Sequence, residues 1–505
     1  MRGERPPAIT RIRLNLVRRI AVSSSLAALW VCPARPQQPE TRLNPTVKQI
    51  VDAISEDRIA AILKKLEGFG TRYVLSPQDD PARGIGAAKR WIRDELASYS
   101  PRLQVSYQDF TIKKGARRGQ IIRDVDLSNI VAVLPGTAEK DRYVLVTAHY
   151  DSLTQVRKPY TGEEQLVAEG VRQGIDEREY RRHLKILPPE RERGPLDFEK
   201  TAESNAPGVT DDGSGTAAVM ELARVMSGYQ FDKTIVFVAF AGEEIGLSGS
   251  QVYASQAKQD GLKIEAVLNN DIIGSDVSGN GRSATDVVRV FSASPDDGTA
   301  RELARYTKLI AERYVPAMHV QMVFRGDRFL RGGDHTPFVR QGFAAVRFTS
   351  ASEHFDNQHS LTDTFANTSV AYATRATRMN GAVLASLALA PAPPELNWTW
   401  SSGPDKGGHE PLLTRGKSGY DAVLHWYPNT EPDLAGYAVM IRSTTSPVWE
   451  REIWVGNVTS YTMPDVSIDD IVIGVKAVDR DGNQSIISCY AEPVLPAQIT
   501  PAEKK

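Results

Sequence analysis

Two adjacent glutamates, Glu243 and Glu244, follow an apolar run in the segment TIVFVAFAGEEIGLSGS. A nearly continuous apolar run of this length is typical of a strand that is buried on both faces. A solvated turn would be the ordinary explanation for the pair, because acidic side chains are most often exposed. Neighbouring carboxylates repel each other, however, and this is unfavourable unless a site makes use of their negative charge.

Other acidic and histidine residues occur in similar positions, at the ends of apolar runs or in the loops that follow. Taken singly, each has a simple explanation as a hydrogen-bonded pair, a helix cap or a turn residue. Together they suggest metal binding, because imidazoles and carboxylates are the ligands of zinc when no thiolate is available. Two metal ions would also offset the repulsion within such an acidic cluster. The residues are His149 and Asp151 in TAHYDS, Asp211 and Asp212 in GVTDDGSG, Asp271 in NNDIIG and His359 in DNQHSLTDT.

Alternating strand and helix patterns must position these residues. Apolar runs predict strands at 129–136, 143–152, 234–241, 264–274, 287–293 and 344–351, and helical periodicity predicts helices at 46–66, at 84–99 and after Asp212. The alternation predicts an α/β sheet covered by helices. Ligands of such folds bind at the carboxyl ends of the strands, and Glu243 and Glu244 lie at one such end.

Six short motifs carry a family resemblance: HYDS, DDGSG, AGEEIGLSGS, NNDIIG, GGDHTPF and QHSLTDT, in this order. With them the chain resembles the co-catalytic dizinc exopeptidases, which include secreted bacterial leucyl-type aminopeptidases and are related to glutamate carboxypeptidase and glutaminyl cyclase. The resemblance implies a mixed, largely parallel sheet covered by helices, with two Zn²⁺ as cofactors. It also implies the ligands: His149 and Asp271 for one zinc, Glu244 and His359 for the other, and Asp211 as the bridge.

The same resemblance implies that Glu243 is the general base and that Asp151 orients His149, whose second ring N–H it can accept. Successive side chains of an extended segment point to opposite sides, so the turn must bend to aim both glutamates inward. Gly242 and Gly246 would permit this bend.

The chain departs from the family pattern at a few positions. Asp212 stands where the family usually has Asn, and a cis peptide is implied before it. Asn270 and Ile272 stand where Leu or Met is usual. His354 is a rival to His359 but lacks the following SLTDT, and His335 is better suited to a supporting or substrate-facing position than to a ligand.

The N-terminal residues 1–34 are expected to be an export signal. Arginines at positions 11, 13, 18 and 19 precede the short apolar stretch 20–31, and small residues allow cleavage after Ala34. Lipidation of Cys32 is disfavoured by Val31. Cleavage would leave Cys489 as the one cysteine of an exported, periplasmic or extracellular protein, without an intramolecular disulfide and without stable membrane insertion.

The remaining chain is expected to form two domains. Residues 35–392 would be the zinc peptidase domain, with a charged insertion at 153–208 that is either a solvated helical segment or a lid or oligomer contact. A proline-rich link at 387–398 precedes short alternating strands at 395–497, which predict an all-β sandwich similar to a fibronectin type III module.

We therefore expect an exported dizinc metallopeptidase that removes N-terminal residues from peptides. A carboxypeptidase is the alternative if Arg325, Arg328 and Arg331 bind a substrate carboxylate. A single-zinc enzyme similar to glutaminyl cyclase, or an inactive receptor-like binding protein, would require ligands to be dispensable or lost. The formal net charge of −1 over 505 residues gives no case for a nucleic-acid partner, and the sequence sets no oligomeric state.

Overall fold

The computed structural model describes residues 43–116, 119–159, 162–172, 174, 176–186, 194–327, 331–399 and 410–491. The predicted export signal, Cys32 and Arg328 lie outside the described residues. Within the described part, no helix is both long enough and apolar enough to span a bilayer.

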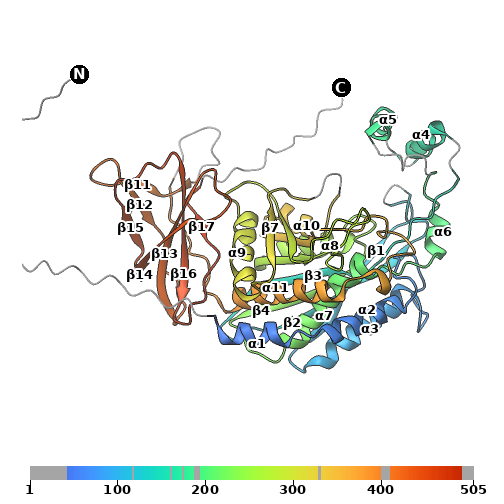
Figure 1. Ribbon diagram of the computed structural model, residues 1–505, viewed down its shortest axis with the longest axis horizontal. Coiled ribbons are helices and arrows are strands. Elements are labelled where there is room, and N and C mark those ends of the chain that lie inside the picture. Colours follow the sequence, from blue (N-terminus) through green and yellow to red (C-terminus); the bar gives the residue numbers. More distant parts are fainter. Residues whose placement is uncertain are drawn as a thin grey trace, which may run out of the picture. The chain divides into compact units, whose positions relative to one another are not determined.

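An eight-stranded sheet with the order β1-β2-β4-β3-β5-β8-β6-β7 forms the centre of the α/β domain (Figure 1). Its parallel core is β4-β3-β5-β8, while β1 and β2 join it antiparallel, and β6 pairs antiparallel with β8 and parallel with β7. The predicted mixed, largely parallel sheet is therefore confirmed. The strands are β1 (Gln104–Ile112), β2 (Val125–Leu134), β3 (Glu139–His149), β4 (Lys233–Phe240), β5 (Lys263–Asn270), β6 (Val287–Ser292), β7 (His319–Val323) and β8 (Ala345–Ser350).

Helices cover both faces of the sheet, and β4 shows why its sequence is apolar throughout. Ile235 and Phe237 belong to the large core on one face, whereas Val236 and Val238 belong to a second core on the other. The large core is completed by α1 (Pro45–Ala53), α2 (Glu56–Glu67), α3 (Gly84–Tyr99), α7 (Ser214–Met226), α9 (Thr299–Tyr314) and α11 (Val370–Leu389), and the second by α8 (Ser248–Gln259) and α10 (His335–Arg340).

Two local features differ from the sequence prediction. The helix predicted at 46–66 is two helices, because Ser55 is extended and caps α2 by accepting a hydrogen bond from the Arg58 amide. The strands β1 and β7 were not predicted. Both have exposed or half-exposed residues along most of their length, so neither produces the apolar run that marks a buried strand.

The insertion contains the helices α4 (Glu163–Arg172), α5 (Glu177–Ile186) and α6 (Phe198–Glu203). In Figure 1, α4 and α5 lie away from the helices that cover the sheet. The half-buried Arg181 forms ion pairs with Glu164 and Glu177. The middle of the insertion is therefore helical and charged, as predicted.

The C-terminal residues form the predicted antiparallel β-sandwich with a core of its own. The ring centroids of Trp426 and Tyr437 lie 5.4 Å apart in this core. The likeness to fibronectin type III remains a prediction. One sheet contains β11 (Leu413–Arg415), β12 (Ala422–His425) and β15 (Ser460–Met463), the other contains β14 (Arg451–Gly456), β13 (Leu434–Ser443), β16 (Ile471–Asp479) and β17 (Ser488–Cys489), and β9 (Trp398–Thr399) pairs with β10 (Glu410–Pro411).

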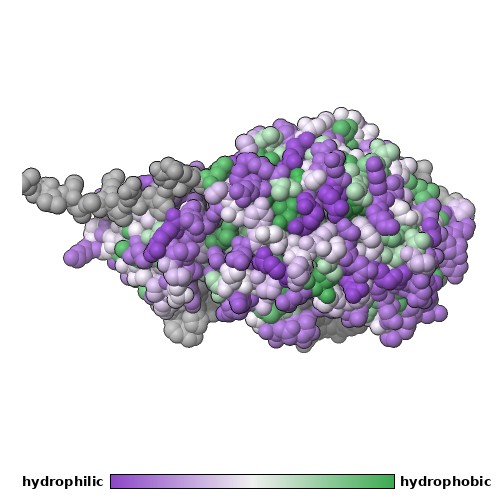
Figure 2. All heavy atoms as spheres, turned by 90° about the horizontal axis from the view of Figure 1, so that it is seen from below, coloured by the Kyte–Doolittle hydropathy of each residue, from purple (hydrophilic) through white to green (hydrophobic). Residues whose placement is uncertain are grey.

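The surface has the mixed character of a globular protein. On the face in Figure 2, hydrophilic residues predominate and hydrophobic ones are scattered among them. Scattered apolar side chains are normal on protein surfaces and indicate no binding site by themselves. The chemically informative residues are therefore the buried polar ones at the edge of the sheet.

Candidate metal centre

The predicted ligands meet at one edge of the sheet because the strands that carry them are parallel. His149 ends β3, Glu244 follows β4, and Asp271 follows β5 directly. Parallel strands place their carboxyl ends at the same edge. His359, in the loop after β8, and Asp211, in the segment before α7, complete the group.

Two groups of three potential ligands share Asp211. His149 Nε2 lies 3.4 Å from Asp211 Oδ1 and 3.9 Å from Asp271 Oδ1. His359 Nε2 lies 3.2 Å from Asp211 Oδ2 and 2.9 Å from Glu244 Oε2. Each carboxylate oxygen of Asp211 thus faces a different histidine, which is the arrangement required of a bridging ligand.

The donor atoms of this centre fit a pair of metal ions. Both His149 Nε2 and His359 Nε2 are buried, yet neither makes a hydrogen bond within the described chain. Buried ring nitrogens normally have a hydrogen-bond partner. Unsatisfied imidazole nitrogens beside carboxylate oxygens are a suitable ligand set for zinc.

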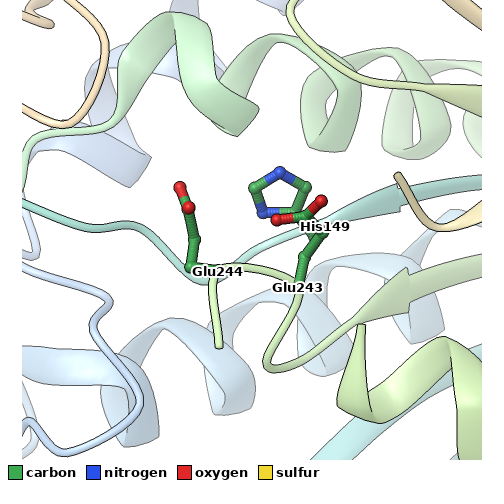
Figure 3. A group of neighbouring side chains, drawn as sticks. All are labelled: His149, Glu243 and Glu244. Atoms are coloured by element: carbon green, nitrogen blue, oxygen red, sulfur yellow. The ribbon is translucent and has the colours of Figure 1, made fainter. Parts of the chain in front are cut away.

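In the turn after β4, the side chains of Glu243 and Glu244 point to the same side of the backbone as the ring of His149 (Figure 3). Gly242 and Gly246 adopt φ angles of 79° and 98°, a region that strongly favours glycine. The amides of Glu243 and Glu244 donate to the two carboxylate oxygens of Asp151, at 3.2 and 3.3 Å. Asp151 therefore fixes the backbone of the glutamate pair.

Asp151 also contacts His149, but through two different oxygens. The Nδ1 atom of His149 lies 3.1 Å from the backbone carbonyl oxygen of Asp151 and 3.6 Å from its Oδ1. The carbonyl is the closer acceptor. Orientation of the imidazole by residue 151 thus combines main-chain and side-chain oxygens, which leaves Nε2 facing the other carboxylates.

Asp212, where the family usually has Asn, joins two ligand loops. Its carboxylate accepts hydrogen bonds from the amides of His149 at 3.3 Å, Gly215 at 2.9 Å and Ile272 at 3.2 Å. In all three hydrogen bonds the side chain of Asp212 is the acceptor, so a carboxylate, which has no N–H to donate, suits this position. The peptide bond between Asp211 and Asp212 is cis, as the family resemblance implied.

Asp363 holds the bridging residue in place and was not predicted as a site residue. Its Oδ1 and Oδ2 accept hydrogen bonds from the amides of Thr210, at 2.8 Å, and Asp211, at 3.0 Å. Burial raises the pKa of Asp363 to about 7, and the nearby negative charge of Asp211 adds to the rise. The signal for this residue was present in the motif QHSLTDT.

Arg72 is a second supporting residue that no sequence motif indicated. Its side chain is fully buried and donates to the carbonyl oxygens of Tyr150 at 2.6 Å and of Pro207 and Gly208 at 2.7 Å each. The guanidinium thereby ties the end of β3 to the segment before Asp211. Its acceptors are backbone atoms far away in the sequence, so residue patterns do not show them.

Two charged groups set the electrostatics around Asp271. Arg347 on β8 lies 2.9 Å from Asp271 Oδ2. Although burial opposes ionisation, this guanidinium and His149 lower the pKa of Asp271 to about 2. Asp334 is buried nearby and hydrogen-bonded by Ser250, and burial raises the pKa of Asp334 to about 7.

The pKa values of the remaining groups shift in opposite directions. Burial, with the negative charges of neighbouring carboxylates, raises the pKa of Glu243 well above its usual range and also raises that of Glu244. For Asp211, burial is outweighed by the two histidines, which hold the pKa of that carboxyl well below its usual range. Glu243 thus combines a raised pKa with a position beside His149 and Glu244.

The other histidines considered as ligands lie outside the two Asp211-centred groups. The ring of His335 is buried and bonds the carbonyl oxygen of Gly326 through Nε2. His354 belongs to none of the potential ligand clusters in the described chain. The structure thus favours His359 over His354 and gives His335 a supporting position.

The base of the insertion is part of the site. Its two arms pair through the bridge between Arg157 and Leu196 and through the hydrogen bond from the Asp197 amide to the Val156 carbonyl, at 2.8 Å. Gln155, next to this pairing, places Nε2 3.2 Å from His359 Nδ1. The insertion therefore contacts the centre, whereas α4 and α5 extend from it.

A small cavity of about 90 Å³ lies between this base and the metal centre. Leu196 and Phe198 from the insertion line it together with Tyr73 and with Glu244 and His359 of the centre. Its size is close to that of one aliphatic side chain. The insertion thus supplies part of the surface that a substrate beside these ligands would meet.

Comparison with known proteins places the chain in a family. Residues 129–384 match the model of peptidase family M28. A probable zinc metalloprotease of Leptosphaeria maculans is 32% identical, with 87% of this chain and 95% of the relative covered. A probable zinc metalloprotease of Pyricularia oryzae is also 32% identical, over 91% of this chain and 87% of the relative.

The solved structures that match include the Legionella pneumophila LapA aminopeptidase, at 19% identity and a TM-score of 0.47 over 70% of this chain and 77% of that one. Another is Fimbriiglobus ruber glutaminyl cyclase, at 17% identity and a TM-score of 0.46 over 70% and 99%. The match of the family model over half of the chain, and the relatives aligned along most of it, decide the assignment. The chain belongs to peptidase family M28.

Proposed function

We propose that this protein is an exported dizinc exopeptidase that removes N-terminal residues from peptides. One observation carries the proposal: the two oxygens of Asp211 face the unsatisfied Nε2 atoms of His149 and His359. Asp271 and Glu244 complete the two ligand sets. Export rests on the sequence pattern of residues 1–34, and membership in a peptidase family supports the peptide substrate.

The residues of the chain supply the proton transfers of this reaction. Zinc ions at the two ligand sets would polarise the scissile carbonyl and increase the acidity of water. Glu243 accepts a proton from the attacking water and delivers it to the leaving amine. Its carboxyl lies beside His149 and outside the two Asp211-centred ligand sets, so it would remain available for proton transfer when those sets hold metal.

Other residues keep this geometry fixed. Asp151 holds the amides of the glutamate pair, and Asp363 holds the segment that carries Asp211. Arg72 ties that segment to the end of β3. Because small displacements at a reacting centre are costly to catalysis, these contacts are expected to matter for rate although they touch no substrate.

Both ligand sets are complete, which favours a dizinc enzyme over a single-zinc cyclase or an inactive receptor-like protein. A carboxypeptidase is the second candidate, because Arg331 lines a cleft beside His359. Arg325 is exposed and does not line this cleft. The two peptidase activities differ in which end of the peptide they need free.

The experiment compares three forms of one tripeptide in parallel: with both ends free, with the amine acetylated, and with the carboxyl group amidated. The zinc content of the protein is measured in the same preparation. We expect about two zinc ions per chain, cleavage of the free and amidated peptides, and no cleavage after acetylation. Chelation should abolish activity. Release of the C-terminal residue from the acetylated peptide would show a carboxypeptidase, and full activity with one zinc would refute the dizinc assignment.

A further inference from the structure

A cleft of about 980 Å³ opens beside the metal centre, and His359 forms part of its wall. Arg157, Lys158 and Arg331 also line it, and Asp356 is the one acidic residue among the described residues of its lining. All three cationic residues are exposed. The cleft therefore presents net positive charge next to a centre that is rich in carboxylates.

Hydrogen bonds hold two of these cations close to the ligand His359. Arg331 Nη1 donates to the side-chain oxygen of Gln358 at 2.7 Å, and Gln358 directly precedes His359 in the chain. Arg157 Nη2 donates to the side-chain oxygen of Gln155 at 2.9 Å, and the same amide lies 3.2 Å from His359 Nδ1. The positive charge is thus fixed to residues that neighbour the centre.

The same cleft exposes apolar surface. Phe355 is 62% exposed and Leu361 is 58% exposed, which are high values for large hydrophobic side chains. Both line the cleft. Apolar walls combined with a few charged groups are typical of sites that bind a small ligand in one orientation.

We propose that this cleft binds a carboxylate of the substrate peptide, on the part of the peptide that is released from the N-terminal residue. The inference rests on the proposed exopeptidase function. It names the substrate class as short peptides that carry either a free C-terminal carboxylate or an acidic side chain within the first residues after the scissile bond. Arg331 and Lys158 bind the carboxylate by charge-assisted hydrogen bonds, while Phe355 and Leu361 contact the apolar parts of the peptide.

The test compares three tripeptides with the same N-terminal leucine: Leu-Ala-Ala with a free carboxyl group, its C-terminal amide, and the amide of Leu-Ala-Glu. Binding is measured by calorimetry on the Glu243→Gln protein, which should bind peptides without cleaving them. We expect both carboxylate-bearing peptides, or one of them, to bind about tenfold more tightly than Leu-Ala-Ala amide. The two peptides distinguish a C-terminal carboxylate from an acidic side chain, and the preference should weaken at high ionic strength.

Introducing Arg331→Gln together with Lys158→Gln should abolish the preference, so that the ratio of the affinities for the carboxylate-bearing peptides and for Leu-Ala-Ala amide falls to about one. The matched control is Arg325→Gln, which removes an exposed arginine near Arg331 in the sequence that does not line the cleft, and should leave the preference intact. Equal binding of all three peptides, or a preference that survives the double substitution, would overturn the inference. Because the readout is binding, these outcomes are separate from failure of the exopeptidase activity itself, which would appear as no cleavage of any peptide by the unmodified protein.

Discussion

The adjacent residues Glu243 and Glu244 should respond in opposite ways to the same substitution. Glu244 Oε2 lies 2.9 Å from His359 Nε2 and belongs to a ligand set that includes Asp211. The carboxyl of Glu243 lies beside His149 and outside both Asp211-centred sets. Glutamine preserves the size of each side chain and removes its charge, so the two variants separate metal binding from proton transfer.

The expected magnitudes follow from these positions. Two unit charges about 4 Å apart interact by about 4 kcal/mol at the effective dielectric constant of a protein site. Because the amide oxygen of glutamine can still approach a cation, we expect Glu244→Gln to weaken one zinc site by roughly 100-fold. Glu243→Gln should leave zinc binding nearly unchanged and lower kcat by about 10² to 10⁴-fold, the usual contribution of a general acid–base group.

The assay is a zinc titration of each metal-stripped variant, followed by both metal content and hydrolysis of a leucyl tripeptide. Added zinc should partly restore activity to Glu244→Gln and should not restore it to Glu243→Gln. Glu199→Gln, at an exposed position on α6, serves as the control. If Glu243→Gln loses zinc while Glu244→Gln retains it, the two roles are reversed. If neither substitution affects hydrolysis, the dizinc mechanism is wrong.

Three further predictions concern the surroundings of the centre. Asp363→Asn removes one of two acceptors for the amides of Thr210 and Asp211, and should reduce the free energy of unfolding by about 1 to 3 kcal/mol and weaken zinc binding, as measured by denaturation and metal titration. Phe198→Ala widens the small cavity and should lower kcat/KM for leucyl substrates by roughly tenfold relative to alanyl ones, as measured on a series of peptides. In metal-stripped protein, the free energy of unfolding should fall as the pH rises towards 7, because Asp334 has a pKa of about 7 when folded against about 3.9 when unfolded, so that the folded state binds the extra proton in that window. A single group can change the free energy of unfolding by at most about 1.4 kcal/mol per pH unit, and Asp334→Asn should make its fall with pH less steep. The prediction is contradicted if chemical denaturation at several pH values gives the same pH dependence for the variant and the unmodified protein.

The sequence predicted the sheet and the ligand positions because both depend on local patterns. An apolar run followed by an acidic or histidine residue marks the end of a buried strand, and parallel strands bring such ends together. Thus His149, at the end of β3, and Asp271, after β5, could be expected near each other although 122 residues separate them. The edge strands β1 and β7 lack such runs and were missed for the same reason.

The supporting residues could not be predicted, because their partners are distant or belong to the backbone. Arg72 donates to carbonyl oxygens of residues 150, 207 and 208, which no residue pattern can indicate. A distant partner also explains Asn270, which stands where the family usually has Leu or Met. Its side-chain oxygen accepts a hydrogen bond from Asn380 of α11 at 2.7 Å. A buried polar residue at a strand end is thereby satisfied within the core. The contact between Gln155 of the insertion and His359 could not be predicted either, because the sequence indicated only a charged helical segment there.

The charge distribution explains why so many acids occur in one place. A buried carboxylate is unfavourable unless it is paired, and Arg347 pairs with Asp271. Around Asp211, Glu243 and Glu244, the nearest cationic partners in the described chain are imidazoles, and the pKa of both glutamates is raised. Burial is the main cause of this rise, and a pair of divalent cations would offset the negative charge gathered there. The Asp211-centred ligand sets do not include Glu243, which lies beside His149 and Glu244, and this position is the reason for proposing it as the group that takes up and releases a proton.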